Sequence, residues 1–331
     1  MIEMRSKWGE LIKGVGIEIL EVIDQGMELY TPGISALLKM ESSQVAQKNF
    51  NGKVSENRIT RKDEGEAADE LARYKTYLTT VDYTAYSAKI EVTRENIMDR
   101  DFSAQLDEAS DLGRAASFSQ DEAGIQLFNG GFDTRKEEIT MGLGPNGATY
   151  RYQYYGDGVP TFSTVHPTVV PGQSTQSNAS ATSIVLSEAN LETGRLALRR
   201  QMTDAGGPVT QGGRESLVVP IGLEKTATVI TESELVPNSA NNDINVYKGN
   251  VGVVSSILMD ALHGGSNTAW FLVVPGATKF IHDVREGMQP WTKVDEDKKT
   301  LVVGLYGRWA NYTKDWRRAW ASKGTQAAYA A

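Results

Sequence analysis

The side chains that most often perform chemistry are sparse in this sequence and widely spaced. The three histidines, His166, His263 and His282, form no HxH, HExxH or HxxxH pattern, so a metal site would need ligands from distant loops. Cysteine is absent, which removes thiolate ligands, disulfides and cysteine nucleophiles. Paired carboxylates occur at residues 137–138 and 295–297, among other charges that favour a solvated face over a tuned acid–base pair. We therefore predict no catalytic, metal-ligating or cofactor-binding residues.

Two glycine-rich stretches do not fit a phosphate-binding loop. Residues 142–147 contain a GxG pattern, but no predicted strand precedes it and no predicted helix follows it. Residues 206–213 lack the GK[ST] ending that places a lysine and a hydroxyl group on phosphates and magnesium. Both stretches are predicted to be turns. An enzyme whose site is spread over several loops stays an alternative, and a monomer with a deep pocket of perturbed titratable groups would favour it.

Composition and charge are ordinary for a globular protein. The chain has 331 residues, 40% hydrophobic and 23% charged, and its net charge is −8. No apolar run approaches the roughly 20 residues that span a bilayer, so no membrane partner is expected. The densest basic cluster is Lys314 with Arg317 and Arg318, which we interpret as a solvated or interface element. An acidic chain of this kind is not expected to bind nucleic acid tightly.

The stretch from residue 187 to residue 233 organises the middle of the chain. Ser187 is a good N-cap for a helix that ends before the glycine-rich residues 204–213. The apolar run Leu217–Val219 then predicts a short buried strand, which Pro220 ends because proline donates no ladder hydrogen bond. A second helix is predicted over residues 221–231.

An amphipathic helix is predicted over residues 7–30. Its apolar positions follow a 3.6-residue period and are Trp8, Leu11, Ile12, Val15, Ile19, Val22 and Ile23. Four glycines weaken it by up to about 1 kcal/mol each relative to alanine, so it needs a surface to dock on. The helix either packs on its own domain or forms an arm that reaches a neighbouring subunit.

A long hairpin is predicted after this helix. Residues 37–62 and 74–93 are predicted to be extended, and the segment between them has no large apolar residue before Leu71, so it should protrude. Its acidic side chains are Asp63, Glu64, Glu66, Asp69 and Glu70. Because an isolated hairpin is marginally stable in water, a long protruding one implies a partner surface, and these five residues are candidate subunit contacts. An ordinary surface hairpin is the alternative.

A second long helix is predicted over residues 101–129. Small side chains repeat along one face, and Gly130–Gly131 stops the helix. Farther on, residues 270–274 predict a buried strand, and residues 301–306 and 310–315 are predicted to pair as two strands. Tryptophan is enriched at subunit interfaces, so we also assign Trp8 and Trp316 to an interface.

Several segments, in this order, resemble the major capsid proteins of tailed bacteriophages with the HK97-like fold. The nearest resemblance is to the Mu-like head-subunit branch. The segments are TREN (Thr93–Asn96), the FST-HP pattern of Thr161–Pro167, LVVP (Leu217–Pro220), ANNDIN (Ala240–Asn245) and AWFLV (Ala269–Val273). The resemblance implies an α+β fold with an N-terminal arm, an extended E-loop hairpin, a peripheral domain with a long spine helix, and an axial domain. The implied bounds are 1–49 for the arm, 50–93 for the E-loop, 94–186 with 266–331 for the peripheral domain, 101–129 for its spine helix, and 187–265 for the axial domain.

The same resemblance implies function and partners. It implies a head protein that self-assembles through hexamers and pentamers into an icosahedral shell. This shell encloses double-stranded phage DNA and contacts it non-specifically. A separate scaffolding protein is expected because the first helix starts by Trp8, and a portal and a decoration protein are further expected partners. The location is the virion, with assembly in the host cytoplasm. The rival within this fold is an encapsulin-like compartment that holds a cellular enzyme.

Overall fold

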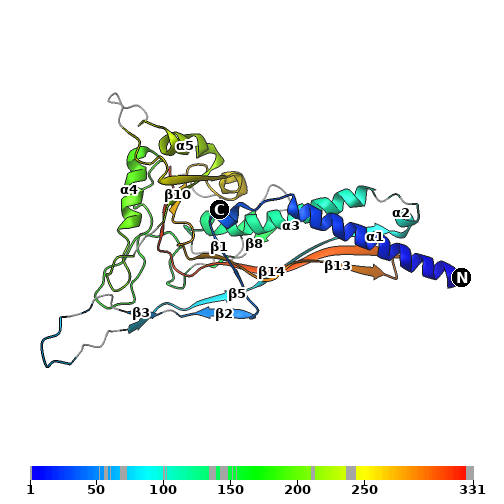
Figure 1. The fold of residues 1–331 in the computed structure, drawn as a ribbon, viewed down its shortest axis with the longest axis horizontal. Coiled ribbons are helices and arrows are strands. Elements are labelled where there is room, and N and C mark those ends of the chain that lie inside the picture. The colour runs from blue at the N-terminus through cyan, green and yellow to red at the C-terminus, as the bar shows by residue number, and fades with distance from the viewer. Residues whose placement is uncertain are drawn as a thin grey trace.

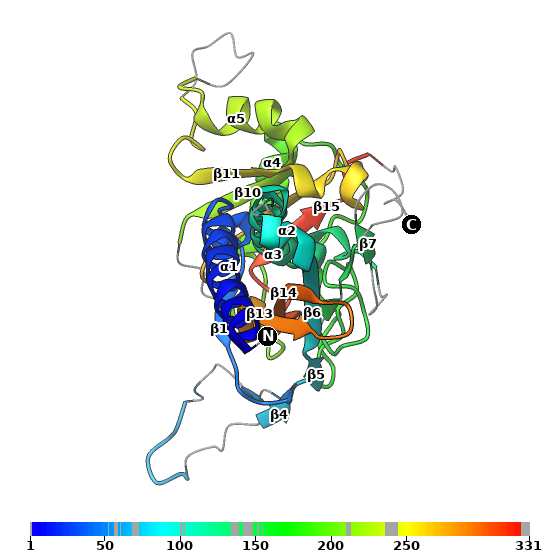
Figure 2. The same cartoon turned by 90° about the vertical axis from the view of Figure 1, so that its right-hand side faces the viewer.

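The computed structural model of this protein combines a long sheet, two long helices lying along it, a smaller sheet at one end and a projecting hairpin (Figures 1 and 2). It describes residues 2–51, 53–55, 59, 61–67, 73–99, 101, 103–133, 139–141, 148–150, 152–153, 155–209, 213–235 and 244–325. The turn predicted at residues 142–147 lies outside the described residues. The body is elongated, and the smaller sheet rises from the end away from the N-terminus (Figure 1).

The long sheet has the strand order β1-β13-β14-β6, with β9 also paired to β14. Its strands are β1 (Lys39–Ser42), β6 (Thr84–Thr93), β9 (Tyr152–Gln153), β13 (Phe280–Asp295) and β14 (Thr300–Thr313). The predicted pairing of residues 301–306 with residues 310–315 is wrong, because residues 301–306 and 310–313 lie along the single strand β14, which pairs with β13. Gly307 lies between the two segments. A larger residue would not fit there, because a Cβ would come 2.4 Å from the Met288 sulfur.

Two long helices cover one face of this sheet. The helices of the body are α1 (Ile2–Glu28), α2 (Arg94–Asp99) and α3 (Ser103–Asn129), which confirms the long helix predicted over residues 101–129. α1 and α3 cross with their backbones in contact. A Cβ on Gly113 would lie 2.2 Å from the Ile23 carbonyl oxygen, and one on Gly26 would lie 2.3 Å from that of Ser110. From Ile12 to Ile23, therefore, α1 packs on its own subunit.

The smaller sheet has the strand order β11-β10-β12-β15. Its strands are β10 (Glu215–Pro220), β11 (Val251–Ser256), β12 (Trp270–Val273) and β15 (Ala319–Ser322), and its helices are α4 (Glu188–Arg199) and α5 (Glu224–Glu232). Four 3-10 turns complete the described helical residues: η1 (Gly33–Ala36), η2 (Ile221–Leu223), η3 (Ile257–Met259) and η4 (Ala261–His263). The sheet draws two strands, β12 and β15, from the range 266–331 that the sequence assigned to a different domain. The strands pair because apolar faces on both sides of β10 and β12 are buried.

The strand at the centre of this unit is as predicted. Leu217, Val218 and Val219 are each 0% exposed, and Pro220 is the last residue of β10. Ser187 caps α4, since its hydroxyl oxygen accepts a hydrogen bond from the Asn190 amide. Leu217 and Val219 face the α4 and α5 side, whereas Val218 faces the cluster around Phe128 of α3.

Candidate assembly surface

A two-part hairpin leaves the body between β1 and β6 of the long sheet. Its inner part pairs β2 (Gln47–Phe50) with β5 (Thr79–Asp82), and its outer part pairs β3 (Lys53–Ser55) with β4 (Arg73–Lys75). A further small hairpin, β7 (Ile139–Met141) with β8 (Ala148–Tyr150), lies elsewhere. In Figures 1 and 2 the outer part extends away from the body, as predicted.

The hairpin ends earlier than the range 50–93 expected from the sequence. β6 pairs with β14 along its whole length, from Thr84 opposite Trp309 to Thr93 opposite Thr300. Val92 of β6 is fully buried under α1 and α3. The strong strand pattern therefore contains two strands: β5 belongs to the hairpin and β6 to the body.

The inner half of the hairpin rests on the outer face of the long sheet. Val81 and Tyr83 are buried against Ile281 and Tyr312, and the Phe50 ring stacks on Tyr312 with 5.2 Å between ring centroids. Two further contact residues, Lys48 and Asp283, were not singled out from the sequence. The available signal was an aspartate inside the apolar strand Phe280–Val284.

The acidic candidates at the tip are accessible where the structure describes them. Asp63, Glu64 and Glu66 are exposed, and Asp63 pairs with Arg61 at 3.1 Å on the surface. Asp69 and Glu70 lie outside the described residues. None of the described tip residues 61–67 belongs to an apolar cluster of the body, so these side chains are open to solvent.

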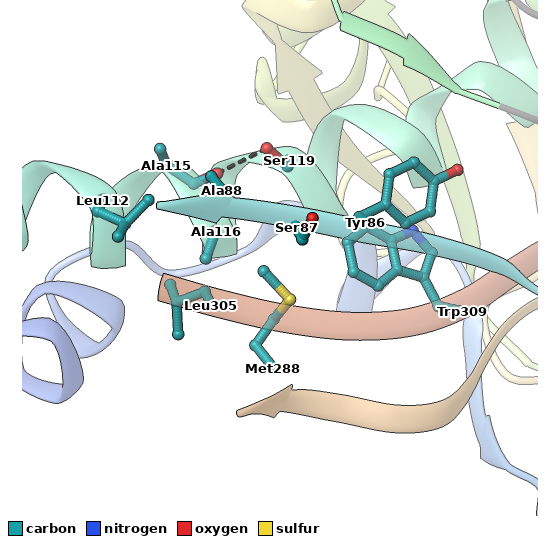
Figure 3. A pocket seen from close by; sticks show the side chains of 10 residues that line it. All are labelled: Tyr86, Ser87, Ala88, Leu112, Ala115, Ala116, Ser119, Met288, Leu305 and Trp309. Carbon is teal, nitrogen blue, oxygen red and sulfur yellow. Dashed lines mark hydrogen bonds between the residues drawn. The ribbon is translucent and has the colours of Figure 1, made fainter. Parts of the chain in front are cut away.

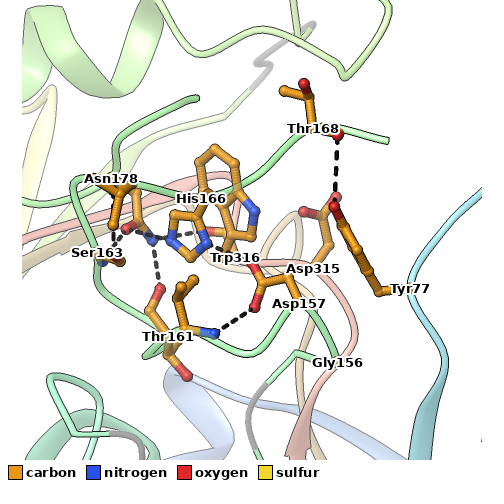
Figure 4. Close-up of polar contacts among 12 residues, drawn as sticks. Tyr77, Gly156, Asp157, Thr161, Ser163, His166, Thr168, Asn178, Asp315 and Trp316 are labelled. Atoms are coloured by element: carbon orange, nitrogen blue, oxygen red, sulfur yellow. Dashed lines mark hydrogen bonds and ion pairs between the residues drawn. The ribbon is translucent and has the colours of Figure 1, made fainter. Parts of the chain in front are cut away.

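The Trp316 side chain, assigned to an interface from the sequence, packs inside its own subunit. Its side chain is 1% exposed and stacks on the His166 ring at 4.1 Å and 8° (Figure 4). His166 contacts Asp157 through Nδ1 at 2.7 Å and Asn178 Oδ1 through Nε2 at 3.0 Å. The Asn178 amide nitrogen donates to the carbonyl oxygens of Thr161 and Trp316, so the cluster fastens loops inside one subunit. Trp8 lies in α1, with its side chain outside the described part of the structure.

Two members of the basic cluster near the C-terminus, Arg317 and Lys314, pair with carboxylates of the same subunit, which corrects their interpretation as a solvated or interface element. Arg317 is 8% exposed and pairs with Asp204 and with Asp315 at 3.0 Å. Burial opposes the charge of Arg317, but these two carboxylates outweigh it and raise the pKa of the guanidinium. Burial also raises the pKa of Asp204, and Arg317 offsets this only in part. Lys314 pairs with Glu41 at 3.0 Å.

A groove between α3 and the sheet offers little chemistry. It has a volume of about 240 Å³, and Leu112, Met288, Leu305 and Trp309 are among its lining residues (Figure 3). No acidic, basic or histidine side chain lines it. In the described part of the chain, no three acidic or histidine side chains gather closely enough to hold a metal ion. Nor does any helix among those residues combine the length and apolar character needed to cross a bilayer.

A family model described as phage capsid protein matches residues 78–322, which is most of the chain. The chain therefore belongs to the phage capsid protein family. No curated protein matches the sequence.

Solved capsids share the fold at low sequence identity. The capsid of the cyanophage P-SCSP1u gives a TM-score of 0.52 at 7% identity, covering 88% of this chain and 88% of that one. The capsid of the empty GTA particle gives a TM-score of 0.50 at 11% identity, covering 88% of this chain and 90% of that one. The capsid of bacteriophage JBD30, decorated with minor capsid protein trimers, gives a TM-score of 0.50 at 15% identity. That match covers 70% of this chain and 92% of the JBD30 chain. These similarities confirm the predicted HK97-like α+β fold; placement in the Mu-like branch stays a prediction.

Proposed function

We propose that this chain is the major head subunit of a tailed bacteriophage and that copies of it assemble through hexamers and pentamers into an icosahedral shell. The observation that carries the proposal is the match of the phage capsid family model over residues 78–322. The projecting hairpin supports it, because a two-stranded element without a core of its own gains order from a partner surface. Many weak, repeated, symmetric contacts then close a shell.

Each structural unit has a proposed place in that shell. The hairpin, the expected E-loop, lies over a neighbouring copy, and Asp63, Glu64 and Glu66 meet basic groups there or set the register by charge. The unit built on β10 lies near the hexamer and pentamer axes as the axial domain. The long sheet with α3 forms the peripheral domain. The first turns of α1, before the part packed on α3, act as the arm.

The proposed partners beyond other copies rest on the family resemblance. They are a separate scaffolding protein, a portal, a decoration protein and the packaged DNA. The net charge of −8 fits a wall that encloses DNA through non-specific contact, since strong basic patches would hold it tightly. We place the protein in the virion and its assembly in the host cytoplasm.

We propose no catalytic activity for the chain. The groove of Figure 3 lacks an acid, a base and a charged nucleophile, and Asp204 and Asp315 already pair with Arg317. The family match favours a phage shell over an encapsulin-like compartment. The two differ in content, because a phage head holds DNA and a compartment holds a protein cargo.

Imaging of the purified full chain tests this proposal. We expect closed shells tens of nanometres across by negative-stain electron microscopy, with DNA as the content of particles from phage-producing cells. A second protein as the sole content would favour the compartment. A chain that stays monomeric at all concentrations and salt conditions, alone and with its scaffolding protein, would overturn the assignment.

A further inference from the structure

A fully buried carboxylate lies at the base of the hairpin. Asp283 of β13 is 0% exposed, and its Oδ2 accepts hydrogen bonds from the Tyr83 hydroxyl at 2.9 Å and the Tyr312 hydroxyl at 3.0 Å. The Lys48 ammonium donates to the same oxygen. Asp283 Oδ1 has no hydrogen-bond partner. Removing one partner of such a pair is strongly destabilising, because it leaves a buried charge uncompensated.

Lys48 connects the hairpin to two strands of the body. It belongs to β2, keeps only 20% of its side chain exposed, and lies 3.9 Å from Glu41 of β1 as well as against Asp283 of β13. Glu41 also pairs with Lys314, whose ammonium lies 4.4 Å from the centre of the Phe50 ring. The first strand of the hairpin is thus held by charge at one point, Lys48, and by stacking two residues farther on.

Beyond Phe50, the described contacts between the hairpin and the body lie on its second strand, near Tyr77. Its pairing register steps by one residue between Phe50↔Thr79 and Lys53↔Lys75. A cleft of about 650 Å³ separates this part from the body and reaches from Val54 to Arg317. On the second strand, the Tyr77 ring meets the Tyr155 ring edge to face with 6.1 Å between centroids, and the Tyr77 hydroxyl lies 3.5 Å from the Thr168 carbonyl oxygen. Nearer the body, the Gly156 amide donates to the Thr79 hydroxyl at 3.0 Å. Packing on the body therefore fixes the inner half, and the outer half takes its direction from it.

We propose that Lys48 and Asp283 are positioning residues for assembly, which fix the direction of the hairpin relative to the subunit body without themselves touching a neighbouring copy. The inference rests on the proposed function only in assuming that the hairpin contacts other copies. A hairpin that points in one direction loses less conformational freedom when it docks. The pair thereby raises the rate at which subunits join.

The direction of the hairpin is measurable in the unassembled full chain. The sequence has no cysteine, so Lys75→Cys on β4 and Asp107→Cys on α3 give two unique spin-label sites. With Lys48 unchanged, we expect a narrow distribution of distances between the two labels by pulsed electron paramagnetic resonance. In the Lys48→Met variant, this distribution should be at least twofold broader. Lys48→Arg should restore the narrow distribution. Lys39→Met is the matched control, because exposed Lys39 pairs with Glu41 at 3.1 Å but does not reach Asp283.

A second variant guards against loss of folding. Lys48→Met with Asp283→Asn removes both charges and leaves none unpaired, so it should fold while still broadening the distribution. An unchanged distribution in either folded variant would overturn the positioning role.

Assembly of the same proteins separates this inference from the proposed function. We expect the initial assembly rate of Lys48→Met, followed by light scattering, to fall at least tenfold, with Lys48→Arg and Lys39→Met near the parent rate. A broadened distribution with an unchanged rate would overturn the role in assembly. If the parent protein forms no shells, the proposed function fails, and the distance distributions still decide whether the pair holds the hairpin.

Discussion

The central strand β10 and the outer half of the hairpin are both short, yet their surroundings are opposite. Leu217, Val218 and Val219 of β10 are covered on both faces by side chains of the same subunit. Beyond β2 and β5, the described hairpin has no such cover, and Ile59 is 95% exposed. β10 therefore contributes to the stability of the subunit, whereas we expect the hairpin to contribute only when a second copy covers it. Substitutions in the two regions should separate folding from assembly.

The largest expected effect is on β10. Val218→Asp would bury an unpaired carboxylate between β10 and α3, which should cost roughly 3 kcal/mol or more in the free energy of unfolding. We expect loss of soluble protein or a large fall in the melting temperature. Val229→Asp on α5, where valine is 43% exposed, is the control and should melt near the parent. A Val218→Asp protein with an unchanged melting temperature would mean that β10 is not a core strand.

The next effect concerns the crossing of α1 and α3. Gly113→Ala would place a Cβ 2.2 Å from the Ile23 carbonyl oxygen, so the helices must separate, at about 1–3 kcal/mol. Gly14→Ala meets nothing within 4 Å and should instead stabilise α1 by up to about 1 kcal/mol. Urea unfolding measures both. Equal stability of the two variants would contradict the packing of α1 on its own subunit.

A smaller effect depends on pH. Burial lowers the pKa of His282 below its usual 6.5, and the hydrogen bond to Asn311 offsets this only in part. The unfolded chain therefore binds the proton first as the pH falls, so stability is full above about pH 6.5 and declines below it. The decline is at most about 1.4 kcal/mol per pH unit while only the unfolded chain is protonated.

His282→Gln should remove this contribution. We compare the melting temperatures of both proteins between pH 7.5 and pH 5, because the carboxylates that also titrate are common to the two. Parallel curves would show that His282 does not titrate with folding.

Local sequence patterns were sufficient to predict the elements that carry a regular pattern of small or apolar residues. The small-residue stripe and Gly130–Gly131 marked α3, and an apolar run ended by Pro220 marked β10. β14 was divided wrongly because its glycines resemble turn residues. In the fold they allow close packing, as a Cβ on Gly304 would lie 2.6 Å from the Trp291 ring.

The polar networks could not be predicted, because their partners are distant in the sequence. Arg317 pairs with Asp204, 113 residues away, and His166 covers Trp316. From their local sequence, Arg317 and Trp316 were both expected to lie at the surface or in an interface. Lys48 and Asp283 are likewise distant partners, 235 residues apart. The protruding tip was predictable because composition alone keeps it out of a core.

The smallest expected effect on folding is at the tip, where the effect on assembly should be large. Reversing Glu64, Glu66 and Asp69 to lysine should leave the free energy of unfolding within about 0.5 kcal/mol of the parent. The reversed charges should slow assembly most at low salt, where screening is weak. A matched surface variant, Asp107→Lys with Glu108→Lys and Asp111→Lys on α3, also reverses three exposed carboxylates and so controls for the change in net charge.

The most direct measurement is sedimentation of the tip variant across a salt series, with circular dichroism of the same samples. We expect an unchanged folded spectrum, with shells that form slowly or in low yield at low salt and recover as the salt concentration increases. Assembly at the parent rate and yield at every salt concentration would contradict it, because the tip would then be only a solvated loop.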